Sequence, residues 1–155
     1  MHPSENLDWD KALRKLGPLA PKNCSPFWLG DSDELSDKLC TLVLGGKKTA
    51  TASLLWEWEF EKLSPPVPGE KHILLDWFNA PLGILTNTSV NIVPFINVTA
   101  DFAELEGEGD LSLEWWRQTH WGYFKNVCIN INRTSTEDMP VVCQEFVFRQ
   151  LGDDA

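Results

Sequence analysis

The sequence predicts an α+β domain in which helices flank a small, mostly antiparallel β-barrel. Its 155 residues, 43% of them hydrophobic, suffice for one sizeable core but not for two full domains. Some segments carry apolar residues at helical spacing, and others alternate apolar and polar residues as strands do. The expected order is helix, helix, several strands, helix, helix, strand. This order does not alternate as βαβ units do, which favours an antiparallel sheet.

The first expected helix covers Leu7 to Leu16, where apolar and charged positions recur at helical spacing before Gly17 and Pro18 end it. We expect residues 1–26 to form a helix and linker that pack on a domain formed by residues 27–155.

The second helix begins after Gly30, with Asp31 as N-cap and Glu34 three residues later, as in a capping box. Gly45 and Gly46 end it, because glycine accepts the left-handed backbone of a helix C-cap. Its apolar residues recur at i, i+4, i+7 and i+8, and they are Leu35, Leu39, Leu42 and Val43.

Strands are expected next. Lys47 to Ser53 is rich in threonine and small apolar residues, which favours a strand. In Leu54 to Leu63 two tryptophans and a phenylalanine alternate with glutamates, which predicts a strand with three aromatics on one face. Further strands are predicted at His72 to Phe78, Leu82 to Val93 and Val141 to Leu151.

A short helix over Val98 to Leu105 and a turn over Glu106 to Asp110 precede a long helix over Leu111 to Cys128. The polar residues Asn130 to Met139 after that helix predict a loop.

On the long helix, Leu113, Trp116 and Phe124 form a stripe that should face the core. Trp115 points nearly the opposite way, so it should stay exposed or line a cleft. His120 falls within the stripe and is interpreted as a hydrogen-bonded core residue rather than a general base or metal ligand.

Lysine and arginine total 13 against 23 aspartate and glutamate, which gives a net charge of −10. This balance argues against tight binding of long nucleic acid, because such binding relies on basic side chains that displace counterions. The negative charge also argues against binding to an anionic membrane surface. No segment approaches the roughly 18 apolar residues of a membrane span, and the charged first twenty residues do not suit a signal peptide. We expect a cytoplasmic protein with no membrane partner.

The four cysteines, Cys24, Cys40, Cys128 and Cys143, are far apart, and none forms the close pair of a zinc site or a redox dithiol. The acidic run from Glu104 to Glu114 does not have EF-hand spacing. We therefore expect free thiols, no metal site and no cofactor.

The segment Gly45 to Ser53 combines a glycine pair with a lysine and several hydroxyl groups. Glycine backbone can approach a ligand closely, and the other groups supply a charge, nucleophiles and hydrogen-bond donors. It is not a P-loop, since the order of elements and the spacing both differ. An ordinary helix C-cap followed by a strand explains the same residues, and both interpretations stay open.

Several motifs between Phe27 and Leu151 together resemble the ASCH family, whose small domains are similar to the PUA RNA-binding fold. The resemblance implies a small β-barrel flanked by helices, with a cleft between them. The motifs are Gly30-Asp31-Ser32, Gly46 to Thr51, Pro94-Phe95, Glu106 to Asp110, Ser112-Leu113, Trp116 and His120.

The general motif of that family is Gly-x-Lys-x-x-Glu-x-Arg. Gly46 and Lys48 match it, whereas Thr51 stands at the glutamate position and Ser53 at the arginine position. The branch with threonine resembles an amidohydrolase that removes the acetyl group from N4-acetylcytidine with a lysine, a threonine and a glutamate. That enzyme type keeps the arginine.

On this resemblance Lys48 is the base, Thr51 the nucleophile, and Glu108, or alternatively Glu106, the orienting or proton-transferring carboxylate. Lysine acts as a base only with a lowered pKa. Residues 48 and 51 would face opposite sides of a regular strand, so Lys48 must lie in the preceding turn or before a bulge. The expected binding residues are Lys47, Ser53, Glu106 and Trp115.

Three functions follow as hypotheses. One is a hydrolase acting on a small modified nucleoside or amide, favoured because a neutral nucleoside meets no repulsion from the negative charge. The second is an RNA-binding module or ribonuclease that uses the same cleft, and the third is a degenerate interaction domain. The first two differ in whether seven basic residues line the cleft. These residues are Lys47, Lys48, Lys62, Lys71, Arg117, Lys125 and Arg133.

Overall fold

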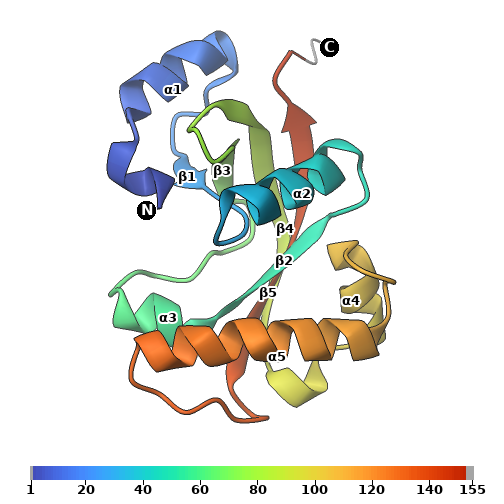
Figure 1. The fold of residues 1–155 in the computed structure, drawn as a ribbon. Coiled ribbons are helices and arrows are strands. Elements are labelled where there is room, and N and C mark those ends of the chain that lie inside the picture. The colour runs from blue at the N-terminus through green and yellow to red at the C-terminus, as the bar shows by residue number, and fades with distance from the viewer. Residues whose placement is uncertain (1, 153–155) are drawn as a thin grey trace.

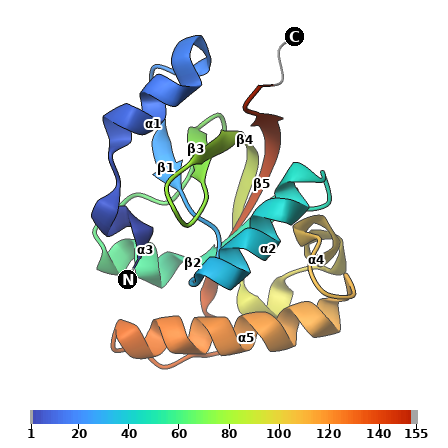
Figure 2. The ribbon, with the colours of Figure 1, turned by 45° about the horizontal axis from the view of Figure 1, so that its top comes forward.

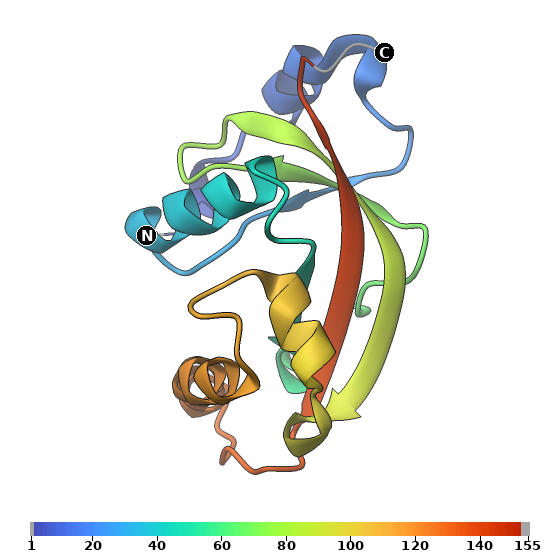
Figure 3. The same ribbon diagram turned by 90° about the vertical axis from the view of Figure 1, so that its right-hand side faces the viewer.

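The computed structural model describes residues 2–152, and its core is one five-stranded sheet that curls into a half-barrel (Figure 3). The strand order is β1-β3-β4-β5-β2, and every neighbouring pair is antiparallel except β1 with β3. The predicted α+β class and mostly antiparallel sheet are confirmed, with a half-barrel in place of a closed one. The strands are β1 (Ser25–Phe27), β2 (Ala50–Leu54), β3 (Lys71–Leu75), β4 (Pro81–Pro94) and β5 (Pro140–Gln150).

The long strands β4 and β5 pair along nearly their whole length, while β3 pairs with the first part of β4 and β2 with the first part of β5. The β4–β5 register shifts between Asn87 and Ser89. A β-bulge of this kind bends a strand and increases its twist, so it favours the curl of the sheet.

Helices occupy the concave side of the half-barrel (Figure 3). They are α2 (Asp33–Leu44), α4 (Ala100–Glu106) and α5 (Leu113–Asn130). The short helix α3 (Leu55–Phe60) follows β2 directly. Figures 1 and 2 show that α5 extends from α4, near its N-terminal end, toward α3.

The N-terminal helix α1 (Trp9–Leu16) packs against one end of the sheet. Its Ala12 and Leu16 share a buried cluster with Ile73 and Ile84. The neighbouring Leu74 belongs to a different cluster, which contains the α2 residues Leu39, Cys40 and Val43. Apolar residues at consecutive strand positions are therefore buried on both faces of the sheet here.

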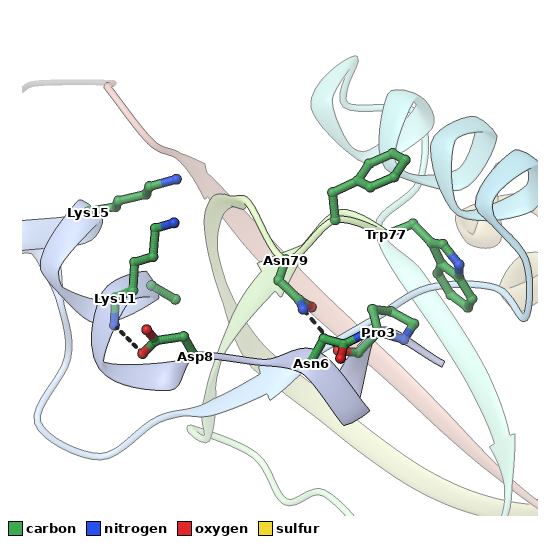
Figure 4. Close-up of a pocket in the computed structure, with 9 residues that line it drawn as sticks. Pro3, Asn6, Asp8, Lys11, Lys15, Trp77 and Asn79 are labelled. Atoms are coloured by element: carbon green, nitrogen blue, oxygen red, sulfur yellow. Dashed lines mark hydrogen bonds between the residues drawn. The ribbon is translucent and has the colours of Figure 1, made fainter. Parts of the chain in front are cut away.

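Hydrogen bonds fasten the segment before α1 (Figure 4). The side-chain amide of Asn79, in the β3–β4 turn, donates to the carbonyl of Pro3 at 2.9 Å. The Asp8 carboxylate caps α1 by accepting from the backbone N–H of Lys11 at 3.0 Å. These contacts border a cavity of about 300 Å³ into which Lys11 and Lys15 also extend.

The strand predicted over Leu54 to Leu63 is wrong, because residues Leu55–Phe60 form α3. Residues two apart lie roughly 200° apart around a helix, so the three aromatics do not share a face. Trp56 packs against the largest core cluster, Trp58 donates its indole N–H to Ser53, and Phe60 is 58% exposed. In six residues an alternating pattern does not distinguish a strand from a helix with aromatics on several sides.

Other boundaries differ by small amounts. Ser32, not Asp31, is the N-cap of α2, and its hydroxyl accepts from the N–H of Leu35 at 3.2 Å. Strand β2 begins at Ala50 rather than Lys47. The three-residue strand β1 was not predicted, since Ser25-Pro26-Phe27 is too short to show alternation.

The α5 helix supplies much of the core. Trp116 and Phe124 are buried as predicted, whereas Leu113 and Trp115 are both half-buried.

None of the helices in residues 2–152 combines the length and apolar character of a membrane span. All four cysteines are free thiols, as predicted.

We expect Phe124→Ala to lower the free energy of unfolding by about 3 to 5 kcal/mol, because it deletes a fully buried ring from the main cluster. Urea denaturation followed by circular dichroism measures the change. The control Lys125→Ala, at the exposed next position, should stay within about 0.5 kcal/mol of the parent. Equal losses in both variants would contradict this packing.

Candidate functional site

Lys48 is the centre of the candidate site, and it is only 2% exposed. It lies in the turn between α2 and β2, where the backbone N–H groups of Lys47 and Lys48 both donate to the carbonyl of Leu42, at 2.9 and 3.1 Å. Gly46, with φ +74°, provides the left-handed backbone of this turn. Lys48 therefore precedes the regular strand, as a joint role with Thr51 would require.

Two carboxylates form ion pairs with the Lys48 ammonium. Its Nζ lies 3.0 Å from Glu106 Oε2 and 2.7 Å from Glu108 Oε2. It also donates to the main-chain carbonyl of Glu106 at 3.4 Å. Glu106 is the last residue of α4 and Glu108 lies in the following loop, so the ion pairs join two segments nearly sixty residues apart.

Gly107 lets these two segments touch. Its φ is +71°, and a Cβ at this position would lie 2.2 Å from the carbonyl oxygen of Lys47. Any side chain here would push the two segments apart, because real Cβ contacts are never this short. The glycine between the two glutamates thus lets both carboxylates reach Lys48.

The second oxygen of Glu106 has partners on α5. Glu106 Oε1 accepts from the Trp116 indole N–H at 3.0 Å, and it lies 3.5 Å from His120 Nε2. His120 Nδ1 lies 3.0 Å from the carbonyl oxygen of Trp116, an acceptor, so Nδ1 carries a hydrogen. The rings of Trp116 and His120 stack at 4.2 Å. Both oxygens of this buried carboxylate are therefore satisfied.

The three charged groups differ in pKa. Burial by itself would raise the pKa of Glu106, but the Lys48 ammonium and His120 outweigh it and hold the pKa well below its usual value. Burial would lower the pKa of Lys48, but the two carboxylates outweigh it and the pKa lies above its usual value. Burial and the neighbouring Glu106 raise the pKa of Glu108, which Lys48 only partly offsets.

Glu108 is consequently the member of the group suited to exchange a proton. Its side chain is 14% exposed, against 1% for Lys48 and 2% for Glu106. A raised pKa together with contact to solvent is typical of a general acid or base, whereas Lys48 and Glu106 are held as ammonium and carboxylate.

Glu106, Glu108 and His120 offer three metal-ligand atoms within 4.8 Å of one another. The Lys48 ammonium already bonds to both carboxylates, so it occupies the position that a cation would take. The chemistry of the group is thus explained by an internal lysine, and we derive no metal step from it.

Thr51 and Ser53 lie apart from this group. Ala50 and Leu54 of β2 are buried in the cluster that α5 completes, and alternating residues of a strand face opposite sides. Thr51 and Ser53 thus face away from that cluster, with Thr51 opposite Gln144 of β5. Ser53 Oγ accepts from the Trp58 indole N–H at 2.9 Å. Among residues 2–152 no hydrogen bond joins Thr51 to Lys48 or Glu108.

The other expected binding residues have different surroundings. Lys47 is exposed in the turn beside Lys48. Trp115 covers the loop that carries Glu108, since a Cβ at Gly109 would lie 2.2 Å from its ring. Trp115 thereby supports the position of the loop.

Sequence reasoning missed two residues of this group. Both residues are among the motifs of the family resemblance, but the helical spacing assigned Trp116 to the core and interpreted His120 as a hydrogen-bonded core residue, with no site role for either. Their spacing of four on one helix face was the available signal, because residues so spaced lie side by side. The identity of the acidic partner depended on the path of the α4–α5 loop, which no spacing reveals.

The basic residues that would favour RNA do not gather around the site. Arg117 donates to the carbonyl of Ile96, Arg133 stacks over Trp56 and Lys71 donates to Thr86. Lys48 forms ion pairs with the carboxylates of Glu106 and Glu108. None of the seven basic residues named above lines the 300 Å³ cavity or a larger cavity of about 610 Å³ near α3. This scatter favours a small ligand over a polyanion.

Comparisons with known proteins agree with the fold. A family model described as the ASCH domain matches residues 26–148. The crystal structure of the ASCH domain from Lactobacillus crispatus JV V101 is similar, with a TM-score of 0.79 and 26% sequence identity, covering 97% of this chain and 96% of that chain. A protein from Enterococcus faecalis V583 has a TM-score of 0.75 and 34% identity, covering 92% of this chain and 86% of that one. The comparison with curated proteins gave no match.

We expect Lys48→Met to lower the free energy of unfolding by about 3 to 5 kcal/mol at neutral pH, because it leaves two buried carboxylates without their cation. Urea denaturation measures this loss, and Lys47→Met, at the exposed neighbouring position, is the matched control.

The loss should be smaller near about pH 5 than at neutral pH. Without Lys48 the folded-state pKa of the carboxyls rises above the unfolded value, so stability is retained at low pH and is lost as the pH rises through the folded-state pKa. A deficit that does not change with pH would contradict the ion-pair geometry.

Proposed function

Because the chain belongs to the ASCH domain family, we propose that it is a hydrolase acting on a small modified nucleoside, of the N4-acetylcytidine type, with Glu108 as its proton-transfer group. The observation that carries this proposal is the buried Lys48 ammonium between a low-pKa and a high-pKa carboxylate. Such a division of pKa values between neighbouring groups is how active sites assign charge stabilisation and proton transfer.

The roles differ from those that the resemblance implies in the base and in the nucleophile. A general base must be able to lose its proton, and the raised pKa of Lys48 opposes this. We therefore assign the proton to Glu108. Lys48 supplies positive charge beside the reacting atoms, and Glu106, fixed by Trp116 and His120, holds the ammonium in place.

The proposed reaction breaks the amide bond between the acetyl group and the exocyclic nitrogen of cytidine. Because Thr51 faces away from the Lys48 group, the nucleophile is assigned to a water molecule. The water attacks the acetyl carbonyl carbon, its proton passes to Glu108, and the oxygen that gains negative charge is stabilised by Lys48. Glu108 then returns the proton to the leaving nitrogen, which breaks the amide bond and releases the nucleoside and acetate.

The charge of the molecule supports a neutral substrate. With a net charge of −10, approach of a phosphorylated polymer is repelled, whereas a neutral nucleoside is not. The scatter of the basic residues supports the same choice. Ser53 at the position of the family's arginine changes how the substrate is anchored, because serine offers one hydroxyl in place of a charged fork.

We expect the purified protein to convert N4-acetylcytidine to cytidine and acetate, measured by chromatography. Glu108→Gln should lower kcat/KM by about 10² to 10⁴, the contribution of a positioned proton-transfer group. Thr51→Val should keep most of the activity, because Thr51 faces away from Lys48 and Glu108. Activity in the parent should fall as the pH falls through the raised pKa of Glu108, since the base must be ionised.

Glu104→Gln, at an exposed position of α4, is the matched control and should keep full activity. No hydrolysis by the parent protein, or an unchanged rate in Glu108→Gln, would contradict the proposal.

RNA binding is the alternative that the same samples test. We expect single-stranded RNA to bind weakly, with an affinity that falls steeply as salt increases, because few unpaired cations are available. Fluorescence anisotropy with a labelled oligonucleotide measures this. Submicromolar binding at physiological salt would favour the binding-module hypothesis.

A further inference from the structure

The larger cavity, of about 610 Å³, is walled by segments from much of the chain. It includes none of Lys48, Thr51, Glu106 or Glu108, so it is distinct from the group described above. Tyr123 contributes from the second half of α5, whereas Trp116 and His120 lie in the first half. The lining residues are His2, Trp28, Gly30, Asp31, Ser32, Asp33, Glu57, Glu61, Trp77 and Tyr123.

Aromatic rings form part of its wall. Trp28 is oriented by its indole N–H, which donates to the Asn79 side chain at 3.1 Å. Trp77 follows β3, and the His2 ring packs edge-on against both indoles, at centroid distances of 5.1 and 5.2 Å. Tyr123 adds a fourth ring from α5. The faces and edges of such rings suit an organic ligand rather than a bare metal ion.

Carboxylates form the rest of the wall, from two directions. Asp31 and Asp33 come from the start of α2, and Glu57 and Glu61 come from α3. No lysine or arginine lines the cavity. Burial and the charge of Glu61 raise the pKa of Glu57, while burial together with Glu57 and Asp31 raises the pKa of Tyr123 to about 12. The side chains thus experience a concentrated negative potential that no lysine or arginine among the described residues of the wall offsets.

We propose that this cavity binds a small organic ammonium cation. Aromatic faces attract such a cation through their quadrupoles, and the carboxylates supply the opposite charge. The inference does not rest on the proposed hydrolysis, because no residue is shared between the two sites.

An anion fits poorly even though the α2 N-terminus borders the cavity. The Ser32 hydroxyl already accepts the N–H of Leu35, and Asp33 and Glu34 lie in the first turn, so the positive end of the helix is compensated from within the chain. A neutral base could stack on the indoles, but it would gain no attraction from the four carboxylates, of which Glu57 is half-buried and the others are exposed.

Isothermal titration with choline and with its neutral isostere 3,3-dimethylbutan-1-ol tests the inference on the full chain. Choline should bind, and the neutral alcohol should bind about tenfold more weakly or not at all, because only the charge differs. The double variant Glu57→Gln, Glu61→Gln should weaken choline binding by about tenfold or more. Glu59→Gln, an exposed glutamate of the same helix that does not line the cavity, should bind as the parent does.

Trp77→Leu should weaken binding in the same way without any change of charge. Circular dichroism confirms that each variant is folded before titration. Equal binding of choline and the neutral alcohol would overturn the inference, as would the absence of choline binding at millimolar concentration or equal effects of the Glu57/Glu61 and Glu59 variants. Glu108→Gln should bind choline normally, so failure of the hydrolase proposal and failure of this inference are separate results.

Discussion

The removal of the Lys48 ammonium from water is the constraint on which the arrangement of the α2–β2 turn, α4 and α5 depends. Burying an ammonium without a counter-charge costs on the order of several kcal/mol, because the ion loses its hydration. The two ion pairs with Glu106 and Glu108 compensate it, and they join the α2–β2 turn to the end of α4. Trp116 and His120 then tie the same carboxylate to α5. One buried charge thereby links four segments: the α2–β2 turn, the end of α4, the α4–α5 loop and α5.

The same arrangement gives the site its chemical asymmetry. Glu106 and Glu108 differ by two positions in sequence, yet one is fully satisfied and the other is open to solvent. Their pKa values are displaced in opposite directions because Lys48 and His120 lower the pKa of Glu106, whereas burial and the charge of Glu106 raise the pKa of Glu108 and Lys48 only partly offsets them. A structural ion pair and a carboxylate with the raised pKa suited to proton exchange therefore share the same three side chains.

Negative charge is used differently at the two ends of α5. Around Lys48 the carboxylates enclose an internal cation. In the cavity near α3 they lie beside aromatic rings, and no lysine or arginine of residues 2–152 is in the wall to balance them. The net charge of −10 thus consists partly of compensated and partly of uncompensated groups. This difference, rather than the total, decides which ligands each end can accept.

The sequence by itself determined the class of the fold, because hydrophobic periodicity and glycine positions are local properties. The C-terminal end of α2, the long strands β4 and β5 and the burial of Trp116 and Phe124 on α5 all followed from spacing. The pairing of Lys48 with a carboxylate beyond α4 was expected only through the family resemblance. Tertiary structure alone decided that α3 is a helix, that Trp116 and His120 complete the site, and that Trp28, Glu57 and Tyr123 share a cavity. Each of these depends on contacts between residues far apart in the chain, and the free energy of burial that selects them has no local signature.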